Sequence, residues 1–353
     1  MIILGKFLLW LSSQLYGLIV AVRNKLYDLG ILKSCSFKMP VICVGNITVG
    51  GTGKTPHVIW LAGILSKMMS VAVLSRGYMR KSRGFRVVSP DDNTSAVGDE
   101  PLQMSRSLPG VKVFVDRDRV HGIREIMRRE PDIRTVVLDD GFQHRAVKAG
   151  LNILLTDWHR LMTRDRLLPL GRLRESLKEI RRAEIIIVTK APHDISAEEI
   201  ARVSDELGSG PNCSVFFTTL AYDQPLSLMR SSEASVTAST SVLLVTGIAD
   251  PSPLLQYLSG ITAKITHLSF PDHHRFTEKD LAMLTRTYDQ LEGEEKMIIT
   301  TAKDAVRLKE ITIIADHVRE AIHYLPVRVQ FIADEEKFLN KVYQYAGKDH
   351  KDS

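Results

Sequence analysis

A glycine-rich loop, in the segment VGNITVGGTGKTP, follows the hydrophobic run 41–44, which is expected to form the first strong strand. Glycines lying so close together let the backbone turn tightly and point its N–H groups inward, which makes a site for an anion. A helix expected to begin at Lys54 adds the positive end of its dipole. This loop therefore favours the binding of a nucleotide's phosphates. The residues expected to contact the nucleotide are Thr48, Val49, Gly50, Gly51, Thr52, Gly53, Lys54 and Thr55.

Lys54 and Thr55 have specific chemistry in a loop of this kind. The Lys54 ammonium reaches the terminal phosphates, and the Thr55 hydroxyl is a ligand of Mg²⁺. The usual spacing has glycine six residues before the lysine, a position that Thr48 occupies here. The loop is a variant, but the hydrophobic run before it and the Gly-Lys-Thr triplet favour a phosphate loop over an ordinary glycine-rich turn.

Two neighbouring carboxylates, Asp139 and Asp140, follow the hydrophobic run 135–138. The carboxyl ends of parallel strands form the edge of a sheet at which ligands bind, so both acids are expected beside the phosphate loop. A phosphate loop needs a carboxylate there to hold its metal ion. We expect these acids to bind Mg²⁺, and Gln143 to face the same cleft.

A further acid, Asp99, lies in the tetrapeptide Gly-Asp-Glu-Pro at 98–101, which opens an expected helix. Two interpretations are open: Asp99 caps the helix, or it is the base that accepts the proton of an alcohol during phosphoryl transfer. His273 and His274 precede another expected helix, and one of them could share a proton with such a carboxylate. A loop histidine without a role is the alternative.

The segment Val-Thr-Lys-Ala-Pro around Lys190 bears on which nucleotide binds. GTP-binding proteins often carry an Asn-Lys-x-Asp motif after such a strand, and its Asp recognises guanine. Pro192 occupies the Asp position here, which disfavours GTP and mildly favours ATP.

Hydrophobic runs and helix patterns alternate along the chain, which predicts an α/β protein with a largely parallel sheet. Strands covered on both faces are expected at 41–44, 71–74, 112–115, 135–138, 152–155 and 184–188. A second α/β series is expected with helices at 251–258, 278–291 and 302–310 and strands at 242–245, 264–268, 297–300 and 327–331. We predict an N-terminal membrane-associated region at 1–30, a P-loop NTPase-like core at 31–220 and a smaller α/β domain at 221–353.

The N-terminal run 7–22 contains no charged residue. It is shorter than the roughly 20 residues that a spanning helix needs. Trp10 and Tyr16, flanked by Lys6 and Arg23, suit a helix that lies in the membrane interface. A helix packed on the protein's own surface is the alternative.

The overall composition limits the classes of partner that this protein is expected to bind. The net charge of +6 fits an anionic partner. The chain has no long Lys/Arg run with interleaved aromatic residues, which argues against nucleic acid. Its 3 cysteines match neither a metal site nor a disulfide framework, so a reducing, cytoplasmic compartment is expected. Nothing in the sequence implies a protein partner.

The motifs together, in their order, closely resemble the tetraacyldisaccharide 4′-kinase family. They are VGNITVGGTGKTP, SRGY at 75–78, GDEP at 98–101, DDGFQH at 139–144, LLPLGRLRE at 167–175, FPDHH at 270–274 and TAKDAVRL at 301–308. The resemblance implies transfer of the γ-phosphoryl group of ATP, with Mg²⁺, to the 4′-hydroxyl of a tetraacyldisaccharide 1-phosphate in lipid A biosynthesis. It implies a peripheral or N-terminally anchored enzyme on the cytoplasmic face of the inner membrane.

The resemblance also implies roles for individual residues. Asp99 and His273 match the family's catalytic pair, with His274 as the fallback, and Lys54 acts with them. Asp139 and Gln143 match nucleotide contacts outside the loop. The implied metal ligands are Thr55, Asp139, Asp140 and Glu100.

Two other hypotheses are open from the sequence. A membrane-bound nucleotide switch or GTPase without lipid kinase activity is one, and Pro192 and the acid-rich cleft oppose it. An adaptor with a degenerate nucleotide site is the other, which the intact Lys54 and Thr55 oppose.

Overall fold

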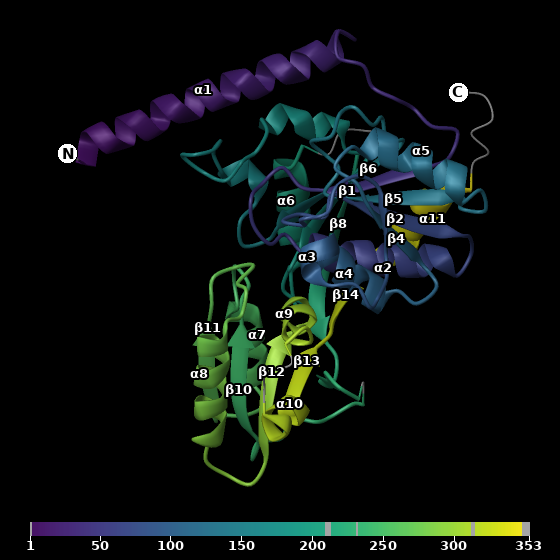
Figure 1. The fold of residues 1–353 in the computed structure, drawn as a ribbon. Coiled ribbons are helices and arrows are strands. Elements are labelled where there is room, and N and C mark those ends of the chain that lie inside the picture. Colours follow the sequence, from purple (N-terminus) through teal and green to yellow (C-terminus); the bar gives the residue numbers. More distant parts are fainter. Residues whose placement is uncertain (1, 209–212, 231, 312–314, 348–353) are drawn as a thin grey trace.

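The computed structural model describes residues 2–208, 213–230, 232–311 and 315–347. It has a larger lobe, which carries a long N-terminal helix, and a smaller lobe below it (Figure 1). Each lobe contains its own mostly parallel sheet with helices. The predicted fold class, an α/β core with a second, smaller α/β part, is confirmed.

The larger lobe is built on a sheet with the strand order β14-β8-β7-β6-β1-β5-β2-β4-β3. All its neighbouring strands run parallel except the edge pairs β14–β8 and β3–β4. The central strand β1 lies between β5 and β6, so the carboxyl ends of all three strands lie side by side at one edge of the sheet. The strands are β1 (Val41–Gly45), β2 (Val71–Ser75), β3 (Arg86–Val88), β4 (Lys112–Val115), β5 (Thr135–Asp139), β6 (Leu151–Asp157), β7 (Ile185–Thr189), β8 (Ser214–Tyr222) and β14 (Val327–Phe331).

Alternate residues of these strands bury on opposite faces of the sheet, as the two-residue period of a strand requires. Ile42 and Val44 of β1 pack with the helices α2, α4 and α11, whereas Val41 packs on the α5 side. Continuous hydrophobic runs are therefore explained by cover on both faces. The helices of this lobe are α2 (Lys54–Ser66), α3 (Thr94–Val97), α4 (Asp99–Ser107), α5 (Arg119–Arg129), α6 (Ala197–Glu206) and α11 (Glu335–Ala346).

The smaller lobe has a five-stranded sheet with the order β11-β10-β12-β13-β9. Its helices expected from the sequence are present, with ends shifted by one or two residues. The strands are β9 (Leu226–Ser227), β10 (Ser241–Thr246), β11 (Ile265–Ser269), β12 (Lys296–Thr301) and β13 (Ile322–Leu325), and the helices are α7 (Ser252–Ser259), α8 (Glu278–Asp289), α9 (Ala302–Leu308) and α10 (Asp316–Ala321).

The C-terminal part of the chain returns to the larger lobe. β14 pairs antiparallel with β8, and Phe338 and Val342 of α11 are buried against the large sheet. The range 221–353, expected for the smaller domain, therefore extends too far, because its last elements complete the other core. We propose that the smaller domain spans about 223–326, between the two paired strands.

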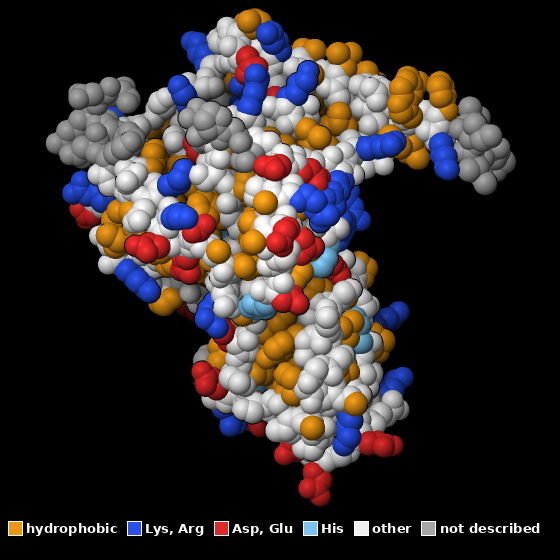
Figure 2. Space-filling view, turned by 180° about the vertical axis from the view of Figure 1, so that it is seen from behind, with side chains coloured by type: hydrophobic (Ala, Val, Ile, Leu, Met, Phe, Trp, Pro, Cys, Tyr) orange, Lys and Arg blue, Asp and Glu red, His pale blue; other side chains and the backbone are white. Residues whose placement is uncertain are grey.

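The N-terminal helix α1 (Ile2–Asp28) projects from the larger lobe, and hydrophobic side chains spread along it (Figure 2). By length and composition alone, Gly5–Asp28 is apolar enough to cross a membrane, and little of it is buried. Such a helix is weak evidence of membrane association. Its exposed large hydrophobic residues are Phe7, Leu8, Leu9, Trp10, Leu11, Leu15, Leu18, Ile19 and Val22.

The middle of α1 is bonded to the larger lobe. Ser13 Oγ donates to Leu167 O at 2.9 Å, and Tyr16 Oη donates to Arg174 O at 2.9 Å. Near its end, Arg23 forms an ion pair with the fully buried Glu175. One face of α1 is therefore held by the segment 167–175, and the opposite face is left open.

Candidate active site

The phosphate loop joins β1 to α2 at the centre of the large sheet. Gly50 (φ 113°) and Gly53 (φ 76°) have positive φ angles that favour glycine. Asn46 holds the two ends of the loop together: its Nδ2 donates to Thr52 Oγ1 at 2.8 Å, and its Oδ1 accepts from Lys54 Nζ at 3.2 Å. The loop is preformed, with Lys54 at the start of the helix.

The outer side of the loop is open to solvent. Val49, Gly50 and Gly51 are exposed, and Thr55 is half-buried in the first turn of α2. Val49 N donates to Arg172 O at 2.8 Å, so the segment that holds α1 also supports the loop.

Asp139, the last residue of β5, is buried beside this loop. Its Oδ2 accepts from Ser75 Oγ at 2.8 Å, whereas its buried Oδ1 has no hydrogen-bond partner among the residues that the structure describes. Burial, together with the nearby charges of Glu100 and Asp140, raises the pKa of Asp139 to about 7. An unpartnered, buried carboxylate oxygen costs free energy unless a cation or proton occupies it.

Asp140 faces two cations, Lys54 of the loop and Arg174. Arg174 donates to its two oxygens at 2.8 and 3.0 Å, and Lys54 Nζ lies 3.7 Å from Oδ1. Burial disfavours the charged form of Asp140, but Lys54 and Arg174 outweigh it and lower its pKa. Asp140 is therefore ionised, and the two neighbouring acids differ sharply in charge state.

Glu100 and Gln143 also border this cleft. Glu100 Oε1 lies 3.7 Å from Lys303 Nζ, and Gln143 Nε2 donates to Asn46 O at 2.8 Å. Among the described residues, no group of three or more His, Cys, Asp and Glu side chains could hold a metal by itself. A metal ion here would take its other ligands from a hydroxyl, from phosphate and from water, as Mg²⁺ commonly does.

Asp99 lies on α4 of the larger lobe and meets residues of the smaller lobe. Gly98 is the N-cap and Asp99 the first helical residue, so the capping interpretation is wrong. Asp99 Oδ2 lies 2.8 Å from His273 Nδ1 and also contacts Arg307, while its Oδ1 accepts from Glu100 N at 3.0 Å. Burial disfavours the charge, but the His273 hydrogen bond and the cations Lys303 and Arg307 lower the pKa of Asp99.

The partners of His273 fix its tautomer. Lys303 Nζ lies 3.0 Å from His273 Nε2, and an ammonium group can only donate. Nε2 therefore accepts, and the ring proton lies on Nδ1, which donates to Asp99. His273, with φ 59° in a tight turn, orients the carboxylate.

His274 points elsewhere. Its Nε2 lies 2.9 Å from Asp280 Oδ2, and its ring stacks on Phe270 with centroids 4.8 Å apart. It therefore belongs to the start of α8, and of the two histidines it is His273 that faces Asp99.

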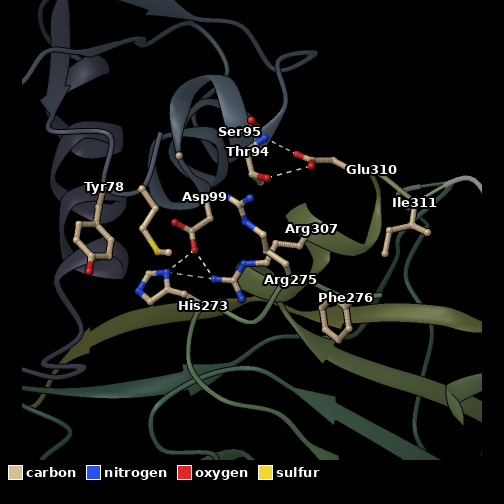
Figure 3. Close-up of a pocket in the computed structure, with 12 residues that line it drawn as sticks. Tyr78, Thr94, Ser95, Asp99, His273, Arg275, Phe276, Arg307, Glu310 and Ile311 are labelled. Atoms are coloured by element: carbon tan, nitrogen blue, oxygen red, sulfur yellow. Dashed lines mark hydrogen bonds and ion pairs between the residues drawn. The ribbon is translucent and has the colours of Figure 1, made fainter. Parts of the chain in front are cut away.

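A cavity of about 280 Å³ opens beside Asp99, between the two lobes (Figure 3). Tyr78 and α3 border it from the larger lobe, and His273, Arg307 and Glu310 from the smaller lobe. Glu310 also holds the start of α3, because its Oε2 accepts from Thr94 Oγ1 at 3.0 Å. An acceptor that enters this cavity reaches the Asp99–His273 pair.

Sequence reasoning missed several residues of this site. Asn46 could have been noticed as a polar residue directly after a buried strand. Lys303 and Arg307 lie in a motif, TAKDAVRL, that carries no local sign of a contact with Asp99. Glu175 lies outside the cleft, buried in ion pairs with Arg23 of α1 and with Arg182.

Known proteins resemble this chain over nearly its full length. The family model for tetraacyldisaccharide-1-P 4′-kinase matches residues 5–346. A tetraacyldisaccharide 4′-kinase of Bacteroides thetaiotaomicron is 43% identical and covers 97% of this chain and 93% of the relative. One from Flavobacterium johnsoniae is 41% identical, with 94% of each covered.

A solved structure agrees in fold as well. The crystal structure of "apo" form LpxK from Aquifex aeolicus in complex with ATP has 33% sequence identity and a TM-score of 0.74, and the match covers 96% of this chain and 99% of that one. These similarities support the kinase hypothesis and not the alternative of a nucleotide switch. The chain belongs to the tetraacyldisaccharide-1-P 4′-kinase family.

Proposed function

We propose that this enzyme transfers the γ-phosphoryl group of ATP to the 4′-hydroxyl of a tetraacyldisaccharide 1-phosphate, a lipid A precursor. The observation that carries the proposal is the 2.8 Å contact between Asp99 and His273, which lies beside a phosphate loop and opens onto a cavity. A switch protein needs the loop but no such pair for an acceptor hydroxyl.

ATP would bind with its phosphates in the loop 48–55. Lys54 is held by Asn46 and Asp140, so its ammonium is already in place when the terminal phosphates arrive. Fixed cations and backbone N–H groups stabilise the charge that develops in phosphoryl transfer without further rearrangement. Gln143 donates a hydrogen bond to the Asn46 carbonyl and so helps to hold Asn46, the partner of Lys54, in place.

The site suits Mg²⁺, the ion that commonly accompanies ATP. Asp139 Oδ1 is a hard oxygen donor, buried without a hydrogen-bond partner among the described residues, and this fits a metal ligand. Thr55 would supply its hydroxyl, with Asp140 and Glu100 close enough to contribute directly or through water. Bound there, Mg²⁺ would neutralise negative charge on the transferred phosphoryl group.

Asp99 would accept the proton of the sugar hydroxyl. As that proton moves to the carboxylate, the hydroxyl oxygen bonds to the γ-phosphorus and the bond to ADP breaks. Asp99 has a lowered pKa and is a weak base, so proton transfer must accompany bond formation rather than precede it. His273 keeps Asp99 oriented by donating from Nδ1, and Lys303 holds the other side of the ring.

The acceptor lies in a membrane, and α1 is suited to reach it. Its midpoint is bonded to the larger lobe through Ser13 and Tyr16, which leaves too little free length to span a bilayer. Its exposed apolar face therefore favours a helix lying in the interface. We place the enzyme on the cytoplasmic face of the inner membrane, where ATP is available.

Purified protein tests this function in detergent micelles with the tetraacyldisaccharide 1-phosphate and ATP. Loss of Asp99 in Asp99→Ala should lower kcat by about 10²–10⁴-fold, the usual contribution of a positioned base. Lys54→Ala should abolish detectable turnover. The matched control is Asp132→Ala, which removes an exposed acid far from the loop and should leave kcat unchanged.

Two results would contradict the proposal. Unchanged turnover in Asp99→Ala would remove Asp99 from the role of base. No lipid phosphorylation by the unaltered enzyme, together with rapid GTP hydrolysis, would favour a nucleotide switch.

A further inference from the structure

We propose that Lys190 is a positioning residue for ATP, which acts by fixing the peptide groups of the phosphate loop from the end of strand β7. The proposal rests on the function above, because it assigns the loop to ATP. It concerns a lysine that the kinase chemistry leaves unused.

Lys190 is bonded to the exposed loop and to a sheltered carboxylate of the larger lobe. Its Nζ donates to Gly51 O at 2.7 Å and to Asp157 Oδ2 at 2.7 Å. The two side chains of this ion pair are only 16% and 10% exposed, so water competes weakly with them. Lys190 also has φ 58°, a left-handed conformation that is costly outside glycine and is held here at the end of β7.

The preceding residue makes a second contact of the same kind. Thr189 Oγ1 donates to Thr52 O at 3.0 Å, and Thr189 is fully buried. Two consecutive residues at the end of β7 therefore hold two consecutive carbonyl groups of the loop. Asp157, at the end of β6, completes the support because its Oδ1 accepts from His159 N at 2.9 Å, which fixes the carboxylate.

These contacts hold two consecutive peptide groups of the loop. The Thr52 N–H, in the peptide that Lys190 holds, donates to Gly50 O at 3.0 Å and closes the tight turn before Gly53. A trans peptide is planar, so its N–H points away from its carbonyl oxygen. When Thr52 O is drawn toward β7, the N–H of Gly53 is directed to the opposite side, where an anion binds. Glycines leave a loop free to adopt other conformations, so external anchors are needed to keep these donors in place before ATP arrives.

Direct contact between Lys190 and a phosphate is the competing explanation, and Asp157→Asn separates the two. If Lys190 acts through the loop, loss of the Asp157 charge loosens Lys190 and raises the KM for ATP, by about threefold. If Lys190 binds phosphate directly, removal of a competing negative charge lowers the KM for ATP.

The main variant is Lys190→Met, which keeps the aliphatic side chain and removes the donor. It should raise the KM for ATP about tenfold, the size expected for one charge-assisted hydrogen bond, and leave the KM for the lipid acceptor unchanged. Thr189→Val, of similar volume, should raise the same KM by a smaller factor. Lys112→Met is the matched control, since Lys112 is an exposed strand lysine paired with Glu130, and both KM values should stay at the parent level.

Each other outcome overturns the proposal. An unchanged KM for ATP in Lys190→Met shows that the loop does not depend on Lys190. Parallel changes in both KM values and in the melting temperature show a general structural role. If Lys190→Met does not fold, the other two variants decide. The proposal is then overturned if the KM for ATP is unchanged or lower in Asp157→Asn and is unchanged in Thr189→Val. Failure of the proposed function is distinct, because the unaltered enzyme then phosphorylates no lipid.

Discussion

Asp139 makes the activity sensitive to pH through the metal ion. Its pKa is raised to about 7, so at pH 6 most of it is protonated, and Mg²⁺ must displace that proton to bind. We expect the apparent affinity for Mg²⁺ to fall about tenfold per pH unit below pH 7. Titrating activity with Mg²⁺ at several pH values measures this, and excess Mg²⁺ should restore the rate at pH 6.

The neighbouring acid provides the comparison for that experiment. Asp140 has a lowered pKa and stays charged throughout, so it cannot produce a transition near pH 7. In Asp139→Asn the transition should disappear along with most of the Mg²⁺ dependence. A Mg²⁺ affinity that is independent of pH between 6 and 8 in the unaltered enzyme would contradict a metal role for Asp139.

At the level of residues, the sequence predicts groups that belong to local patterns. The glycine loop and Asp139 each follow a hydrophobic strand, and the edge of a parallel sheet brings such positions together. Arg307 contacts Asp99, and Lys303 lies 3.7 Å from the neighbouring Glu100. Both come from roughly two hundred residues away along the chain, and no local pattern encodes these contacts. The chemistry at the loop is therefore readable from sequence, whereas the electrostatic setting of Asp99 depends on tertiary structure.

Among the elements, α1 is expected to bind membranes through the face that the larger lobe leaves open. Replacing Leu15 and Leu18 with Ser should lower partitioning onto anionic vesicles strongly, since each buried leucine contributes about 1.5–3 kcal/mol. Both side chains are about 60% exposed, so folding should be unaffected. Sedimentation with vesicles measures the change.

The opposite face of α1 supplies the control for this prediction. Tyr16→Phe removes the hydrogen bond to Arg174 O on the protein side, and vesicle binding should stay at the parent level. Deletion of residues 1–24 should weaken binding at least as much as the Leu15 and Leu18 changes. Equal partitioning of the truncated and full-length proteins onto vesicles would contradict the assignment of α1 to the membrane interface.

The strands that sequence reasoning located in the large sheet have continuous hydrophobic runs. The helices α5 and α11, which it missed, carry charged residues on their exposed faces and are apolar on one side only. For α6 a usable sign existed, because Ser196 and Glu199 form a capping box at its start. The edge strand β14 was found as a strand, but its partner β8 was not, so its return to the large sheet could not be foreseen.

Considered as a whole molecule, the smaller lobe is an insertion between two paired strands of the larger one. β8 leaves the large sheet and β14 returns to it, with Val327 opposite Tyr222 at the exit. The contacts of Asp99 with His273 and Arg307 close the other side of the junction. The active site is therefore completed only when both lobes are folded and in contact.

This topology predicts that a substitution in α11, near the C-terminus, destabilises the larger lobe. The smaller lobe, which directly precedes β14 and α11 in the sequence, should be unaffected. Phe338 of α11 is fully buried, with its ring 5.6 Å from Trp60 of α2 and 5.0 Å from Phe331 of β14. Phe338→Ala should lower the stability of the larger lobe by about 3–5 kcal/mol through the cavity it leaves. Hydrogen exchange should speed up in β1, β7 and β8 and stay slow in β10 and β12.

Leu284→Ala, in the core of the smaller lobe, is the reciprocal variant, because Leu284 is buried to a similar degree. It should speed exchange in β10 and β12 and leave β1 protected. ATP should slow exchange in Phe338→Ala, since a ligand that binds only the folded state shifts the equilibrium toward it. If Phe338→Ala instead loosened the smaller lobe, α11 would act as part of that lobe, and the division at β8 and β14 would be wrong.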